Sequence, residues 1–192
     1  ARIAARMTGW IEDGYDIIAM TPSCALMLKF EWPLMVPDNT QVRRLADATF
    51  DLSEYVVDIA EKEGLAEGMK PLPGGVAVHL ACHARAQNMG AQAAKLLRQL
   101  PDTDVTIVER CSGHGGSWGI KTENFPVALK VGAPAAQRAA DADAAFVVSE
   151  CPLAGKHIVQ GMEQIDGALD KLDTAQAFHP IELMARAYGN TK

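Results

Sequence analysis

Apolar residues in this chain fall into blocks rather than being evenly spread. Four short and nearly continuous apolar runs are bounded by turn residues, a pattern typical of buried parallel strands. These runs cover residues 16–20, 76–81, 104–110 and 144–150. Since parallel strands are covered by helices, the pattern predicts an α/β fold with helices packed around short strands.

Between the runs, apolar residues recur three or four positions apart, which predicts amphipathic helices. The clearest of these stretches is 52–62, whereas Gly132 and Pro134 weaken the helix predicted at 125–140. The segment 61–75 is rich in Gly, Pro and charge and is expected to be an exposed loop. The predicted helices cover 1–13, 25–30, 41–49, 52–62, 89–100, 125–140, 153–172 and 179–188.

The cysteines share one position, because each follows one of the four apolar runs. Ligands of open α/β sheets sit beyond the carboxyl ends of the strands, so all four thiols are expected on that edge. A disulfide framework belongs to short secreted domains and does not fit this chain. The four residues are Cys24, Cys82, Cys111 and Cys151.

The third cysteine opens a glycine-rich loop, with the sequence RCSGHGGSWG from Arg110 to Gly119. Glycine lets the main chain approach a ligand closely. A thiolate beside exposed backbone N–H groups suits a metal cluster or an anion.

Thiolates select zinc, copper(I) or iron–sulfur clusters. Structural zinc sites usually draw on closely spaced Cys-x-x-Cys pairs, whereas each cysteine here comes from its own element. Four such thiolates match the ligand count of one [4Fe-4S] cluster. Two alternatives stay open: a zinc site, and a metal-free interaction domain with four unrelated buried cysteines. A thiol–disulfide oxidoreductase is disfavoured because the chain has no Cys-x-x-Cys motif.

Five residues beside the cysteines are expected around such a centre. For His83 and His114, the roles of ligand, proton carrier and hydrogen-bond donor stay open. His83, Arg85 and His114 would add positive charge or hydrogen bonds, and Ser112 and Gly113 would order the loop. The competing interpretation makes the histidines polar loop residues and Arg85 one half of an ordinary ion pair.

Several other side chains have a structural interpretation. His79 lies inside a predicted strand and is expected to be a hydrogen-bonded core histidine, and Trp118 is expected to pack in the core. His157 and His179 are expected to be surface or capping residues. The acidic residues show no paired-carboxylate pattern.

Four segments resemble the cysteine-rich (CCG) domain of iron–sulfur oxidoreductases. They read TPSCALMLKFEWP, HLACHARAQNMG, VERCSGHGGSWG and SECPLAGKHI. The resemblance is to the type found in the C subunit of anaerobic glycerol-3-phosphate dehydrogenase, which is related to the B subunit of heterodisulfide reductase. It implies an iron–sulfur electron-transfer subunit, rather than a catalyst alone, between a flavin or ferredoxin-like donor and a quinone or disulfide acceptor.

The chain departs from the family pattern in three places. Cys24 would close the preceding repeat, whose Cys-x-x-Cys motif has become Thr21-Pro22-Ser23-Cys24. The adjacent cysteine pair has become Cys111-Ser112, and the Cys-x-x-Cys motif that begins at Cys151 ends in Ala154. These departures favour one cubane held by four cysteines over the five-cysteine noncubane cluster.

The resemblance also predicts an organisation of the 192 residues. Residues 1–30 would end a preceding CCG-type repeat, 31–75 form a helical linker region, and 76–192 form a second repeat. All would pack as one unit in the C-terminal part of a longer protein. A net charge of −6 argues against a nucleic-acid partner. No apolar run reaches the ~18 residues of a membrane span, so the expected location is cytoplasmic, with peripheral membrane contact through a redox partner.

Overall fold

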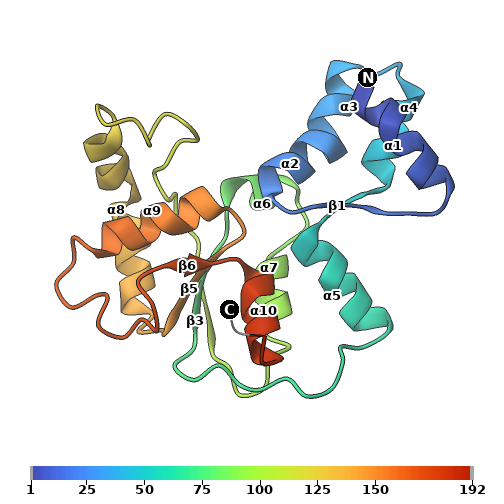
Figure 1. The fold of residues 1–192 in the computed structure, drawn as a ribbon. Helices are drawn as coiled ribbons and strands as arrows, with labels where there is room; N and C mark the ends of the chain where they lie inside the picture. Colours follow the sequence, from blue (N-terminus) through green and yellow to red (C-terminus); the bar gives the residue numbers. More distant parts are fainter. Residues whose placement is uncertain (1, 191–192) are drawn as a thin grey trace.

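Two parallel sheets organise the computed structural model, which describes residues 2–190 (Figure 1). The larger sheet has the order β4-β3-β5-β6, and β1 pairs with β2 in a second sheet. Every pairing is parallel. The predicted α/β class is therefore confirmed, but with the strands divided between two sheets. The strands are β1 (Ile17–Ala19), β2 (Thr49–Asp51), β3 (Val76–His79), β4 (Val105–Val108), β5 (Phe146–Ser149) and β6 (Ala177–Phe178).

Helices connect and cover these strands. Those of the N-terminal part lie to one side of the larger sheet in Figure 1. The helices are α1 (Arg2–Glu12), α2 (Pro22–Leu26), α3 (Trp32–Met35), α4 (Thr40–Asp47), α5 (Leu52–Lys62), α6 (Cys82–Ala86), α7 (Gln92–Leu97), α8 (Phe125–Asp141), α9 (Pro152–Met162) and α10 (Pro180–Ala187), with a π-helix, η1 (Met27–Glu31), between α2 and α3.

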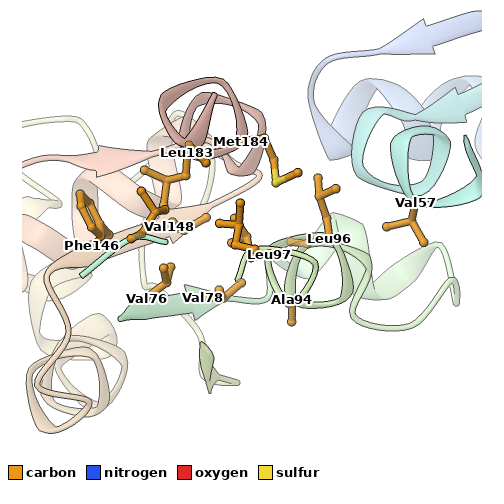
Figure 2. Packing of buried hydrophobic residues seen from close by; sticks show 14 residues of the cluster. Val57, Val76, Val78, Ala94, Leu96, Leu97, Phe146, Val148, Leu183 and Met184 are labelled. Atoms are coloured by element: carbon orange, nitrogen blue, oxygen red, sulfur yellow. The ribbon is translucent and has the colours of Figure 1, made fainter. Parts of the chain in front are cut away.

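Both faces of the central strands are covered, so every residue of β3 and β5 is buried. Val76 and Val78 point with Phe146 and Val148 into one core, which α7 and α10 complete (Figure 2). Ala77 and Val147 face the opposite way, into a second core beneath α8 and α9. Alternate residues of each strand thus serve two cores, which explains why the runs are continuously apolar rather than alternating.

The helix predicted at 25–30 begins earlier and continues further than expected. Pro22 opens α2, so Cys24 lies inside a helical turn, and the helical path runs through η1 into α3. Pro33 does not stop it, because it occupies the first turn of α3, where its missing N–H costs little.

Three short elements were not predicted. β2 begins at the last residue of the helix expected at 41–49, and α6 and β6 lie where no element was expected. The helix expected at 153–172 ends at Met162, and turns follow it. β2 and β6 have two or three residues, too few to show a period, and they exist through pairing with β1 and β5.

Candidate metal centre

Three of the four cysteines lie beyond the carboxyl ends of adjoining strands. Cys82, Cys111 and Cys151 follow β3, β4 and β5, which are neighbours in the larger sheet. Cys24 follows β1 of the smaller sheet, in α2, and α2 packs against α6, which begins at Cys82. Helix packing, rather than a shared sheet, therefore relates Cys24 to the other three.

All four cysteines are free thiols, and Cys151 is less exposed than the other three. Burial raises the pKa of the Cys82 thiol, and the negative charges of Cys111 and Cys151 raise it further, while Arg85 opposes the shift. Two neighbouring thiols are thus close enough to influence the ionisation of Cys82. Within residues 2–190, however, no three His, Cys, Asp or Glu side chains already form a group able to hold a metal ion. The free thiols at this edge are donors of the kind that binds zinc, copper(I) or an iron–sulfur cluster.

A chain of hydrogen bonds ties the strand ends together. The Cys151 N–H donates to Ser149 Oγ over 3.3 Å, Ser149 Oγ lies 3.1 Å from His79 Nδ1, and His79 Nε2 lies 2.9 Å from the Arg110 carbonyl oxygen. A carbonyl only accepts, so Nε2 carries the proton and Nδ1 accepts from the serine hydroxyl. His79 is 1% exposed and its burial lowers its pKa. The prediction of a hydrogen-bonded core histidine is confirmed, and this histidine also links the residues beside Cys111 and Cys151.

We expect His79→Leu to lower the free energy of unfolding by about 2 kcal/mol at pH 8, because the buried Ser149 hydroxyl and the Arg110 carbonyl oxygen lose their partner. The folded-state pKa of His79 lies below the unfolded value of about 6.5. Its neutral ring therefore stabilises the fold fully above that pH, and this contribution is lost as the pH falls through the lower value. Urea unfolding should show that the difference in free energy of unfolding between wild type and variant narrows below about pH 6.5.

The exposed His83 on the same edge provides the control for this measurement. His83→Gln should change the free energy of unfolding by no more than about 0.5 kcal/mol. A difference in free energy of unfolding between wild type and His79→Leu that stays constant from pH 8 to pH 5 would contradict a neutral ring held by two hydrogen bonds.

The glycine-rich loop brings two further donors to the thiols. The Gly113 N–H donates to Cys111 Sγ over 3.4 Å. His114 Nδ1 accepts from the Gly116 N–H, so its Nε2 carries the proton and donates to Cys151 Sγ over 3.5 Å. Burial, and then the charges of His157 and His83, lower the pKa of His114. The loop thus hydrogen-bonds two of the four thiols through a neutral imidazole and one backbone N–H.

Close backbone contact holds this loop on α8. Gly113 has φ +82°, and a Cβ on it would lie 2.3 Å from the Ala128 carbonyl oxygen and 2.5 Å from Gly132 N. A Cβ on Gly132 would in turn lie 2.3 Å from the Ser112 carbonyl oxygen. Gly132, which weakened the helix in the sequence pattern, is needed for this contact, and α8 continues through it and through Pro134.

Four other side chains with a predicted role have defined positions in the structure. Arg85 forms an ion pair with Glu109, 3.0 Å apart and about half exposed, as the competing interpretation expected. His179 caps α10, as predicted. His157 is buried beside Phe125 rather than on the surface or at a cap. The prediction that Trp118 packs in the core is wrong, since this side chain is 46% exposed.

A buried polar cluster behind the cysteine edge was missed from the sequence. Gln87 Nε2 donates to Asp51 Oδ2 over 3.3 Å and to the Pro22 carbonyl oxygen over 3.4 Å. Burial raises the pKa of Asp51. Burial and then the Asp51 charge raise the pKa of Glu150 to about 7. The cluster joins Pro22 and Glu150, which precede Cys24 and Cys151, to Gln87, which follows the helix that begins at Cys82. Its only signal in the sequence is one glutamate closing an apolar run.

These features can be compared with known proteins. Residues 76–158 match the CCG family, described as a cysteine-rich domain. This segment contains β3, β4 and β5 together with Cys82, Cys111 and Cys151, whereas Cys24 precedes it. The resemblance seen in the cysteine segments is confirmed.

Longer relatives extend the similarity beyond this segment. The C subunit of anaerobic glycerol-3-phosphate dehydrogenase from Escherichia coli (strain K12) is 27% identical over 175 residues, covering 91% of this chain and 41% of the relative. The B subunit of fumarate reductase (CoM/CoB) from Methanothermobacter marburgensis is 25% identical over 183 residues, which cover 93% of this chain and 34% of the relative. An uncharacterized iron–sulfur protein from Methanocaldococcus jannaschii is 27% identical over 125 residues, covering 63% and 24%. The chain spans well under half the length of each.

Among the described residues, none of the helices has both the length and the apolar character needed to cross a bilayer.

Proposed function

We propose that this chain is an iron–sulfur electron-transfer domain of an oxidoreductase complex, in which Cys24, Cys82, Cys111 and Cys151 hold one [4Fe-4S] cluster. The observation that carries the proposal is the placement of three free thiols beyond adjoining strand ends of the segment that matches the CCG family. The fourth thiol comes from α2, which packs on the helix that begins at Cys82. Two oxidoreductase subunits and an iron–sulfur protein among the relatives support it.

When bound, such a cluster supplies one-electron transfer. The chain's own residues hold and tune the thiolates. The Gly113 N–H and the neutral His114 Nε2–H donate to ligand sulfurs, which stabilises their negative charge. Cys151 also stands at the N-terminus of the 11-residue α9, where the helix dipole favours an anion. The raised pKa of the Cys82 thiol reflects in part a repulsion between thiolates that a bound cation would remove.

The proposal assigns the substrate chemistry to partners. The donor would be a flavoprotein or a ferredoxin-like domain, and the acceptor a quinone or a disulfide. Residues 1–30 would end a preceding CCG-type repeat, 31–75 would link, and 76–192 would form the second repeat. The proposed location is cytoplasmic, with peripheral attachment at the inner membrane face through a partner.

Iron and sulfide analysis after anaerobic purification or reconstitution tests the proposal. We expect about four iron and four sulfide per chain and a brown protein. The electron paramagnetic resonance spectrum of the reduced sample should be that of a single cluster. A colourless protein that keeps no iron after anaerobic reconstitution would contradict the proposal.

A zinc site is the second candidate. The observation that favours it is the 3.5 Å distance between Cys151 Sγ and His114 Nε2, since zinc commonly takes mixed thiolate and imidazole ligands. Binding there would require Nε2 to give up its proton. Stoichiometric zinc in protein from anaerobic cells, with no cluster formed on reconstitution, would establish it in place of iron.

A further inference from the structure

Two buried carboxylates lie close together between the two sheets. Asp51 ends β2 of the smaller sheet, Glu150 follows β5 of the larger one, and each residue is 2% exposed. Burial and then the Asp51 charge raise the pKa of Glu150 to about 7, so the two carboxylates are near enough to repel each other. Buried charges are costly unless a group of opposite sign offsets them.

The positive side chain that acts on this pair is engaged elsewhere. Burial, the largest influence, raises the pKa of Asp51, and the Lys29 charge opposes it too weakly to reverse the shift. Lys29 forms an ion pair with Glu54. The groups that act on Glu150 are Asp51 and the side chain of Ser53, and neither is positive. The described residues therefore leave the two negative charges largely uncompensated.

Three oxygen atoms around the pair have no hydrogen-bond partner in the part of the chain that the structure describes. They are Ser53 Oγ, Gln87 Oε1 and Glu150 Oε1, on residues that are 0%, 4% and 2% exposed. The Gln87 amide donates from Nε2 to Asp51 Oδ2 over 3.3 Å, so its unpaired oxygen lies beside the carboxylates. Since buried polar atoms in folded proteins are almost always bonded, these oxygens indicate a ligand that oxygen donors hold.

These four side chains form one oxygen cluster, which consists of Asp51, Ser53, Gln87 and Glu150. Calcium takes carboxylate and amide oxygens in irregular geometry, whereas magnesium keeps several of its waters and is poorly suited to so buried a place. A divalent cation would balance both carboxylates, and a sodium ion only one. The donor set and the charge therefore favour calcium.

We propose that the oxygen cluster binds one calcium ion, which holds the smaller sheet to the larger one. Gln87 also donates to the carbonyl oxygen of Pro22, two residues before Cys24, and Glu150 directly precedes Cys151. The ion would therefore fix two thiol-bearing segments relative to each other. This site goes beyond the proposed function and does not depend on it, because calcium binds oxygen donors and thiolates select softer metals.

The test measures calcium binding to the whole chain, after treatment with EDTA, by calorimetry at pH 8, which is above the pKa of Glu150. We expect one site per chain with a dissociation constant on the order of 0.1 mM, and magnesium binding at least about tenfold weaker. Calcium at about 10 mM should also raise the urea concentration at which the chain unfolds, because the ion binds only the folded state. No saturable binding at that concentration, or magnesium binding as tight as calcium, would overturn the proposal.

Two variants locate the site. Glu150→Gln and Asp51→Asn each remove one charge from the oxygen cluster, and Asn can still cap α5. Each should weaken calcium binding at least about tenfold. Because Glu150→Gln relieves the repulsion between the carboxylates, this variant without calcium should unfold at the same urea concentration as wild type or a higher one. Its loss of calcium binding would then not reflect a loss of folding.

Asp170→Asn is the matched control. Asp166 and Asp170 are exposed in the turns after α9, and they offer calcium an acidic alternative on the surface. Removing one charge there should leave the calcium affinity unchanged. An affinity that falls in Asp170→Asn, or that neither Glu150→Gln nor Asp51→Asn reduces, would overturn the assignment to the oxygen cluster.

Discussion

Cys111→Ser is expected to lose the cluster or to retain only a labile three-iron remnant, whereas Ser112→Ala, one residue later, should keep the full iron content. An alcohol gives up its proton far less readily than a thiol, whose pKa is about 8.5, so serine is a poor replacement ligand at neutral pH. Ser112 is 4% exposed and belongs to the loop segment that rests on Gly132. Its hydroxyl is expected to order the loop or to bond a cluster sulfide, so its removal should shift the reduction potential only modestly.

The measurement is iron per chain after anaerobic reconstitution, with a redox titration of each sample. The two substitutions are adjacent in the loop and similar in size, so a general loss of loop structure would affect both. If Ser112→Ala loses iron as completely as Cys111→Ser, the ligand assignment is wrong and Ser112 binds the metal.

Gly113→Ala is expected to lower the free energy of unfolding by about 4 kcal/mol or more, and to cost most of the iron. Two effects combine at this residue. Its φ of +82° is unfavourable for alanine, and the new Cβ would meet the backbone of α8 at 2.3 Å and 2.5 Å. Main chain cannot rotate away as a side chain can, so the loop carrying Cys111 would have to leave α8.

Gly116→Ala is the matched control for Gly113→Ala. Gly116 lies in the same loop with φ +61°, but a Cβ there would meet nothing within 4 Å. Only the conformational strain remains, so the free energy of unfolding should fall by about 1 kcal/mol and the iron content should be kept. Urea unfolding and iron analysis of both variants check the prediction. If both variants lose the same free energy of unfolding, backbone strain, and not the contact with α8, dominates at Gly113.

Local patterns in the sequence determined much of this protein. The helix predicted at 52–62 is α5, because its apolar spacing and its capping residue Asp51 are local features. The four apolar runs became β1, β3, β4 and β5. Full burial fits the nearly continuous runs of β3 and β5, whereas β1 and β4 are only partly buried. The position of each cysteine after a run was also visible, and it led to the three thiols at one edge of the larger sheet.

Tertiary structure alone decided the rest. The pairing of β2 with β1, and the placement of Cys24 through α2 and α6, depend on contacts between segments far apart in the chain. The same is true of the links from His79 to Ser149 and Arg110, and of the buried cluster around Gln87 and Glu150. A polar residue in an apolar run has no local sign of its partner, because hydrogen bonding and burial depend on which surfaces meet when the chain folds.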